Sequence, residues 1–186
     1  MATAVARRQF SVVDYHRMVK AGILGEDDRV ELIAGEVLEM SPIGTRHAAC
    51  VDRLNAFLTR EAGANAIVRV QSPILLDDYS EPQPDLALLR VRDDYYMYAH
   101  PTPADVLLVV EVSDSSMTYD HEVKLPLYAE ATIGEVWLVN IPTERIECYT
   151  QPVDGSYKVT DTLGRGQTLT STVLPNLATA IDSIFG

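Results

Sequence analysis

Three short apolar runs constrain the fold of this 186-residue chain more than any other feature. They lie at residues 85–89, 106–112 and 136–141, and few polar residues interrupt them. A strand that alternates apolar and polar residues keeps one face in water, whereas a strand without such alternation is buried on both faces. We therefore predict an α/β (α+β) fold, in which a central mixed β-sheet is flanked by α-helices.

The segments around these runs carry helix signals. Ser11 and Asp14 form a capping pattern before the first expected helix. After Gly44, apolar residues recur at three- and four-residue steps, which is typical of a helix with one buried face. Pro126 lies inside a later helix, which is therefore expected to start late or to kink. The expected helices span 12–21, the stretch from Gly44 to Gly63, 121–131 and 177–185.

Further strands are expected on both sides of the three runs. Residues 29–40 read as a hairpin with its turn at Ala34 and Gly35. Residues 66–76 contain Pro73, which is tolerated only at an edge or a bulge. Residues 145–150 and 157–162 alternate like a solvent-facing pair of strands joined by a turn.

Charge and length exclude several classes of protein. There are 27 acidic and 15 basic residues, and the formal net charge of −12 repels nucleic acid and anionic membranes. Any contact with nucleic acid must therefore depend on a local site. The apolar runs are too short to cross a bilayer or to form a signal peptide, so we expect no membrane partner. Without a linker, repeat or cysteine framework, we expect one cytoplasmic domain over residues 1–186.

Two carboxylates mark the ends of two of the apolar runs. If these strands pair antiparallel through residues 91–104, Leu89 faces Leu107 and Asp85 faces Glu111. Opposed side chains have their Cβ atoms roughly 5 Å apart. Carboxylates at that distance repel each other unless one is protonated or a cation lies between them. A hard divalent cation such as Mg²⁺, which needs only one or two protein carboxylates, fits this arrangement.

Lys124 is the third member of this candidate site. The chain has only three lysines, and this one lies on the helix that follows Glu111. If that helix packs against the sheet, the ammonium group reaches the carboxylate pair, where it can hold an attacking water or neutralise a phosphate oxygen. Asp120 lies four residues earlier, at a spacing that would let it orient Lys124.

At this point the sequence resembles a known group. Pro84–Asp85, the strand that ends in Glu111–Ser113, and Lys124 are similar to the PD-(D/E)XK nuclease superfamily, and more narrowly to the Uma-two family of restriction-endonuclease-like proteins. The matching segments run from about Tyr15 to the end and are VELIAGEVLEMSPIG, His47, SEPQPDLALLR, the His100–Pro101 turn, DVLLVVEVSDSS and YDHEVKLPLYAEATIGEVWLVN. One position differs from the superfamily pattern, because Ser113 occupies the place of the usual lysine. In the family that the chain resembles, this lysine comes from the following helix, which here carries Lys124.

The resemblance implies a restriction-endonuclease-like fold and a metal-dependent endonuclease that hydrolyses phosphodiester bonds of nucleic acid. In that picture Mg²⁺ or Mn²⁺ is bound by Asp85, Glu111 and the carbonyl of Val112, and Glu31 completes the catalytic set with Lys124. DNA is the expected substrate, with RNA left open, and a homodimer is one open arrangement of the chain.

Three more residues are candidates for accessory roles. His47 follows a turn and opens a helix, where capping or packing competes with a role at the metal or phosphate. Asp120 is a candidate through Lys124. Ser113 begins a hydroxyl-rich stretch that either binds phosphate or simply leads into the next helix.

Two other functions compete with the nuclease. The acidic balance favours a nuclease-fold protein that no longer cleaves and serves as a binding or scaffolding subunit, because phosphate contacts dominate affinity for nucleic acid. A glycosidase built on a carboxylate pair needs aromatic residues around the acids, and only the 95–98 stretch offers them. The intact set of Asp85, Glu111 and Lys124 favours the enzyme.

Overall fold

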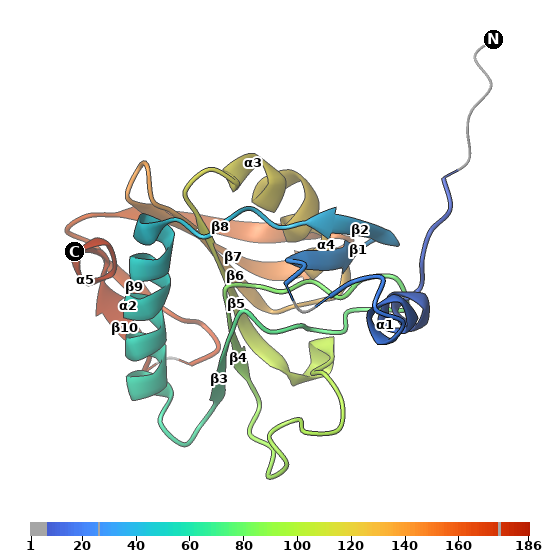
Figure 1. Ribbon diagram of the computed structural model, residues 1–186. Helices are drawn as coiled ribbons and strands as arrows, with labels where there is room; N and C mark the ends of the chain where they lie inside the picture. The colour runs from blue at the N-terminus through green and yellow to red at the C-terminus, as the bar shows by residue number, and fades with distance from the viewer. Residues whose placement is uncertain (1–6, 26, 175) are drawn as a thin grey trace.

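A six-stranded mixed sheet forms the centre of the computed structural model, which describes residues 7–25, 27–174 and 176–186 (Figure 1). The strand order is β3-β4-β5-β6-β7-β8. Only the β5–β6 pair is parallel, and the other neighbours are antiparallel. The strands are β3 (Ile67–Val70), β4 (Leu86–Leu89), β5 (Val106–Ser113), β6 (Glu135–Asn140), β7 (Arg145–Val153) and β8 (Ser156–Gly164). The predicted fold class is confirmed, with the three apolar runs as the inner strands β4, β5 and β6.

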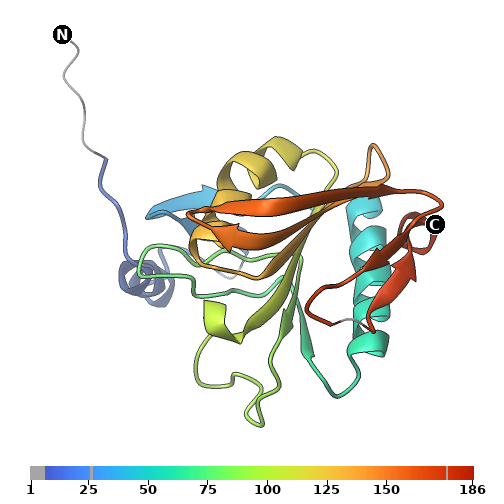
Figure 2. The same ribbon diagram turned by 180° about the vertical axis from the view of Figure 1, so that it is seen from behind.

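Helices cover both faces of this sheet, as Figures 1 and 2 show. The long helix α2 (Thr45–Ala62) packs on one face, where Leu54 and Leu58 meet the β5 residue Leu108. The short helix α4 (Leu125–Glu130) packs on the other face, where Tyr128 joins a second apolar cluster. Alternate residues of β4 and β5 thus contribute to two different cores, which explains why these strands carry so few polar residues.

A hairpin and the first helix form a separate unit beside the sheet. Strands β1 (Val30–Ile33) and β2 (Glu36–Glu39) pair antiparallel, and the turn residues Ala34 and Gly35 have positive φ angles of 48° and 79°. Helix α1 (Val12–Lys20) begins at a capping box formed by Ser11 and Asp14, as predicted. Val12 and Tyr15 pack with Val30 and Leu32 in a small third cluster.

The C-terminal segment differs from the prediction of one helix over 177–185. Residues Ala178–Ala180 form strand β10, which pairs antiparallel with β9 (Thr168–Thr170), and only α5 (Ile181–Phe185) is helical. The apolar spacing that suggested a longer helix instead buries Leu177 and Ile181 against the α2 side of the sheet. Pairing with β9 overrides the local helix preference of the alanines.

The third predicted helix also begins earlier than expected. It consists of α3 (Met117–Tyr119), a π-helical turn η2 (Asp120–Lys124) and α4. In an α-helix the ring of Pro126 would clash with the carbonyl oxygen of Glu122, and the wider π turn lies directly before this proline. The segment therefore continues past Pro126 rather than starting there.

The β4–β5 register brings the two predicted carboxylates to the same end of the sheet. Leu86 pairs with Val110, so Asp85 and Glu111 are the next residues along each strand. At the other end a bulge between Leu88 and Leu89 makes Leu89 pair with Val106, and the expected Leu89–Leu107 pairing is wrong. The connection between the strands ends in a 3₁₀ turn, η1 (Pro103–Asp105).

Candidate functional site

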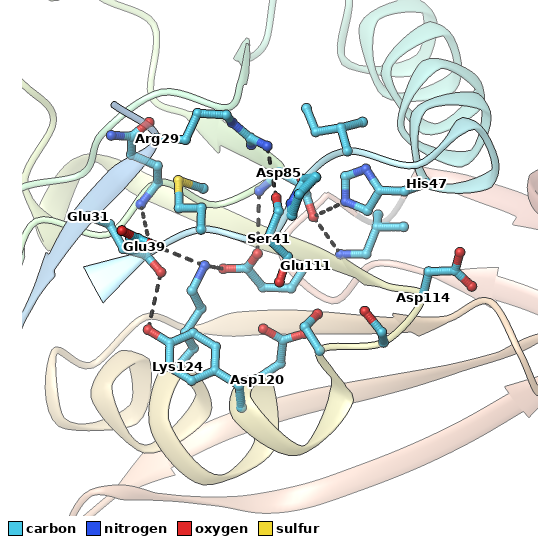
Figure 3. Close-up of a pocket in the computed structure, with 18 of the residues that line it drawn as sticks. Arg29, Glu31, Glu39, Ser41, His47, Asp85, Glu111, Asp114, Asp120 and Lys124 are labelled. Atoms are coloured by element: carbon cyan, nitrogen blue, oxygen red, sulfur yellow. Dashed lines mark hydrogen bonds and ion pairs between the residues drawn. The ribbon is translucent and has the colours of Figure 1, made fainter. Parts of the chain in front are cut away.

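A pocket of about 560 Å³ lies where β5 ends, between the β1–β2 hairpin, the start of α2 and the α3–η2 segment (Figure 3). Most of the residues predicted from the sequence line it. They are Glu31, His47, Asp85, Glu111, Val112, Asp120 and Lys124. Ser113 is absent from the pocket lining because its side chain is buried behind the wall, where it binds Asp120.

Asp85 sits just before β4 and accepts hydrogen bonds from three sides. His47 Nε2 lies 3.0 Å from Oδ2, the Val112 N–H donates to Oδ2 at 2.9 Å, and the Gln71 amide donates to Oδ1 at 3.2 Å. Burial opposes ionisation, but His47, through its hydrogen bond and charge, together with the Val112 N–H, lowers the pKa of Asp85 below its ordinary value. Asp85 is therefore held as a carboxylate.

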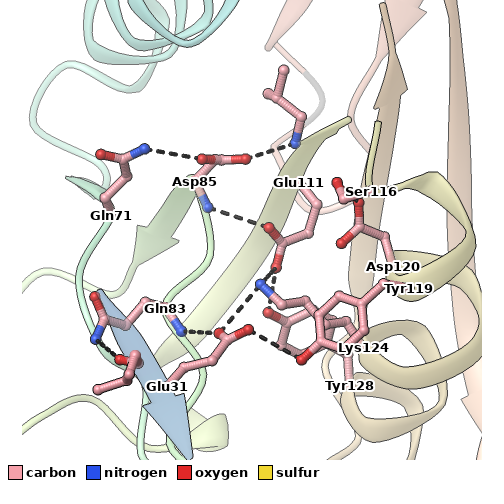
Figure 4. A network of polar contacts seen from close by, with 12 residues as sticks. Glu31, Gln71, Gln83, Asp85, Glu111, Ser116, Tyr119, Asp120, Lys124 and Tyr128 are labelled. Carbon is pink, nitrogen blue, oxygen red and sulfur yellow. Dashed lines mark hydrogen bonds and ion pairs between the residues drawn. The ribbon is translucent and has the colours of Figure 1, made fainter. Parts of the chain in front are cut away.

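Glu111 points to the opposite helix layer and is buried, as are Glu31 and Asp120. Oε1 accepts from Lys124 Nζ at 3.1 Å and from the Tyr128 hydroxyl at 2.6 Å, while Oε2 lies 3.4 Å from the Asp85 N–H (Figure 4). Burial raises the pKa of Glu111 to about 8, against the attraction of Lys124. Asp120 and Asp85 raise it further.

Lys124 joins the hairpin to the central sheet. Its ammonium group lies 3.1 Å from Glu111 of β5 and 3.3 Å from Glu31 of β1. Burial disfavours the charged form, but the two carboxylates outweigh it and raise the pKa of Lys124 above its ordinary value. Glu31 is fixed in turn by the Gln83 N–H at 3.0 Å and the Tyr119 hydroxyl at 3.2 Å. The sequence-based placement of Lys124 beside Glu111 agrees with this geometry.

Asp120 does not contact Lys124 in the way its spacing suggested. Its carboxylate accepts hydrogen bonds from the hydroxyls of Ser113 and Ser116, the latter at 2.9 Å. The i,i+4 spacing places two side chains on one face in an α-helix, whereas here residues 120–124 form a π turn. Asp120 acts on Lys124 through its charge alone, and it fixes the turn between β5 and α3.

His47 lies in the first turn of α2 with one nitrogen engaged and the other free. Nε2 binds Asp85, and Nδ1 is a buried atom without a partner among the described residues. The hydrogen bond to Asp85 raises the pKa of His47, against the effect of burial. The imidazole thus holds the Asp85 carboxylate through Nε2.

The pocket carries far more negative than positive groups. Its lining includes the acids Glu31, Glu39, Asp85, Glu111, Asp114 and Asp120, and the cations Arg29 and Lys124. Carboxylate oxygens in excess over cations are the donor set that Mg²⁺ and Mn²⁺ prefer. The N–H and C=O of one strand residue point to the same side, so the carbonyl of Val112 is directed to the edge where Asp85 lies. The residues present therefore fit a hard divalent cation.

Several residues of the site have no clear signal in the sequence. Tyr128 and Tyr119 bind the two buried glutamates, and Gln83 and Gln71 fix Glu31 and Asp85. For Tyr119, Tyr128 and Gln83 only their positions within the matching segments offered a hint, and Gln71 lies outside those segments. The arginines next to Asp85 in sequence, Arg90 and Arg92, follow the far end of β4 and do not line the pocket.

The aromatic 95–98 stretch is also remote from the acids. Tyr96 is buried against Arg92, whose guanidinium lies 4.4 Å from the ring centre, and no residue of the stretch lines the pocket. The one aromatic stretch that the sequence offered for binding a sugar therefore lies away from the acids, which removes that support for a glycosidase. None of the helices in the described ranges is long and apolar enough to cross a membrane.

Comparisons with known proteins agree with the fold and the family expected from the sequence. A family model named Uma2, described as "Putative restriction endonuclease", matches residues 12–182. A crystal structure of "a putative nuclease belonging to DUF820" from Anabaena variabilis ATCC 29413 is similar, with a TM-score of 0.70 and 11% identity. The match covers 95% of this chain and 97% of that chain, and at this identity it shows a common fold. No curated protein matches the chain.

Proposed function

Because this chain belongs to the Uma2 family of restriction-endonuclease-like proteins, we propose that it is a metal-dependent endonuclease acting on DNA. The observation that carries the proposal is the position of Asp85 and Glu111 at adjacent strand ends, in a pocket with a buried lysine. Buried carboxylates without enough cations are costly, so a site that only stabilises the fold would not retain them.

Mg²⁺ or Mn²⁺ would be held by Asp85, Glu111 and the carbonyl of Val112. When bound, such an ion lowers the pKa of a coordinated water and neutralises charge that develops on the phosphate. The protein contributes the arrangement around it. His47, Gln71 and the Val112 N–H fix the Asp85 carboxylate, and Tyr128 fixes Glu111.

Lys124 is proposed to stabilise the negative charge of the transition state. Its ammonium group is buried among Glu31 and Glu111, so it is held in one position before any substrate binds. Glu31 and Tyr119 keep it there from the hairpin side. In this scheme Glu31 positions the lysine, while Asp85 and Glu111 bind the metal.

In this proposal, the bound metal makes DNA binding compatible with the net charge of −12. Without the metal, six carboxylates line the pocket and repel phosphate. With the metal, Arg29 in the lining and Arg46, which pairs with Asp114 at 3.3 Å, add positive charge at the rim. DNA binding is therefore expected to require the divalent cation and to weaken steeply with salt.

A cleavage assay tests the proposal. Purified protein should nick plasmid DNA with Mg²⁺ or Mn²⁺ and not with a chelator, and Asp85→Asn and Glu111→Gln should each abolish nicking. Glu147→Gln is a matched control, because that carboxylate also pairs with a histidine, His121, but lies outside the pocket. Equal nicking by all four proteins would identify a contaminant and refute the assignment.

A catalytically inactive binding or scaffolding protein is the second candidate, and the net charge favours it. It predicts binding without cleavage under every metal condition. A homodimer is also proposed, supported by the exposed loop residues Tyr95, Met97 and Tyr98, which are 68%, 75% and 84% exposed. Sedimentation of the wild type and of a Met97→Asp variant tests it.

A further inference from the structure

Two histidines and one glutamate meet outside the pocket, at the junction of α1 with the loops. His16 comes from α1, Glu81 from the segment before β4, and His100 from the connection between β4 and β5. These three positions are far apart in sequence. One potential ligand atom from each lies within 4.8 Å of the others.

The geometry within the cluster is already close to that of a metal site. His16 Nε2 lies 2.9 Å and 3.1 Å from the two oxygens of Glu81. The rings of His16 and His100 meet edge to face, with their centres 6.2 Å apart. Donors around a tetrahedral ion with bonds of about 2.1 Å are about 3.4 Å apart. The His16–Glu81 pair nearly has this spacing, and His100 offers a third donor atom within 4.8 Å of both.

Burial distinguishes this cluster from an ordinary surface ion pair. The side chain of Glu81 is 3% exposed, whereas that of His16 is 51% exposed. A buried carboxylate needs a positively charged or hydrogen-bonding partner, and the exposed histidine leaves a path for an ion from solvent. Glu81 is also anchored by its backbone, because its N–H donates to the carbonyl of Leu32 in β1 at 2.7 Å.

We propose that His16, Glu81 and His100 form a second metal site, which takes Zn²⁺ or a similar transition-metal ion. Two imidazoles and one carboxylate are a donor set that favours such ions over Mg²⁺. An ion here would cross-link α1, the segment beside the hairpin and the β4–β5 connection. Outside this cluster, α1 packs on the hairpin through Val12, Tyr15, Val30 and Leu32, and the β4–β5 connection is held by a hydrogen bond from the Leu75 N–H to the Pro101 carbonyl. The expected role of the ion is therefore structural.

The chain offers a matched control for this site. His121 and Glu147 form another half-buried pair, with Nε2 3.0 Å from Oε2. No third histidine, cysteine or carboxylate completes that pair as a metal-ligating group in the described ranges. If a histidine–glutamate pair bound metal ions non-specifically, His121–Glu147 would bind them as well as His16–Glu81 does.

The experiment uses the full chain carrying Asp85→Asn, so that the pocket does not contribute, after treatment with a chelator. Co²⁺ and Zn²⁺ are added to this parent protein and to His100→Ala, His16→Ala and His121→Ala made in it. The parent and His121→Ala should show visible Co²⁺ absorption bands of a four- or five-coordinate site and a rise in melting temperature with Zn²⁺. His100→Ala and His16→Ala should lose the bands, and their Zn²⁺ affinity should fall at least about tenfold.

Two results would overturn the proposal. One is a parent protein without Co²⁺ bands and without a Zn²⁺-dependent rise in melting temperature. The other is a His100→Ala variant that binds Zn²⁺ as tightly as the parent. If His100→Ala does not fold, His16→Ala decides alone, because His16 is half-exposed on the surface of α1. Since the pocket is disabled throughout, the outcome is independent of nuclease activity.

Discussion

Lys124 and Glu111 form a buried ion pair, with Nζ 3.1 Å from Oε1 and side chains that are 6% and 4% exposed. They belong to different elements, the π turn η2 and strand β5. Ser113, two residues after Glu111, is equally buried but bonds to Asp120 instead. The ammonium group thus reaches the acid from the neighbouring helix rather than from the strand.

Replacement of Lys124 by Met should separate catalysis from folding. The turnover number for DNA nicking should fall by about a hundredfold or more, because an electrostatic stabiliser is lost, while metal affinity changes little. The metal-free protein should also lose about 3 kcal/mol of stability, since two buried glutamates lose their cation. Both are measured on folded protein, by nicking kinetics and by urea unfolding.

Lys158→Met is the control for that variant, because Lys158 is exposed on β8. It should keep wild-type kinetics and stability. An unchanged turnover number for Lys124→Met would assign the lysine a structural role only.

Removal of the Glu111 charge should change how stability depends on pH. The folded state raises the pKa of Glu111 to about 8, from an ordinary value of 4.5, so it holds a proton that the unfolded chain has released. Metal-free stability should therefore fall as the pH rises from about 4.5 to about 8. In Glu111→Gln this part of the slope should vanish. Urea unfolding with a chelator at several pH values measures it, and parallel profiles for the two proteins would contradict the prediction.

Asp85→Asn should destabilise the metal-free protein. Two facing carboxylates alone predict that removing one charge relieves repulsion. The structure instead gives the Asp85 carboxylate three donors, and its pKa is lowered despite burial. Loss of these charge-assisted bonds should cost about 1–2 kcal/mol, which lowers the melting temperature by roughly 2–8 °C. A higher melting temperature would show that repulsion dominates.

Metal binding should release protons. Burial raises the pKa of Glu111 to about 8, so a share of the metal-free molecules carries a proton on this carboxyl near neutral pH, and a bound cation favours the ionised form. Titration calorimetry with Mn²⁺ in two buffers of different ionisation enthalpy should show release of a substantial fraction of one proton, which declines above pH 8. Glu111→Gln should show no such release, and buffer-independent heats for the wild type would refute the linkage.

Local patterns were sufficient for the central sheet, α2 and the hairpin, because each is set by residues close in sequence. The same holds for the meeting of Asp85 and Glu111, which follows from the pairing of two adjacent strands. The β9–β10 pair was missed because the apolar spacing at residues 177–185 indicated a helix, and the π turn was missed because Pro126 was expected to delay or kink the helix. Tyr128 was missed because its partner Glu111 lies on another element, 17 residues away.

The meeting of His16, Glu81 and His100 had no signal of metal binding in the sequence. The His100–Pro101 turn and the segment that contains Glu81 were noted only for the family resemblance, and neither histidine has a helical spacing to another ligand. Sequence periodicity cannot reveal a contact between residues that are far apart in the chain, whereas it does reveal carboxylates at the ends of apolar strands.

The bulge at Leu88–Leu89 has a consequence for engineering this protein. The bulge lies at the end of β4 next to the β4–β5 connection, and the length of this strand, about 13 Å, separates that connection from the pocket. An insertion or deletion near the exposed residue Met97 changes only the β4–β5 connection, and we expect it to leave the Asp85–Glu111 register in place. A recognition module inserted in this loop should therefore leave the pocket undisturbed.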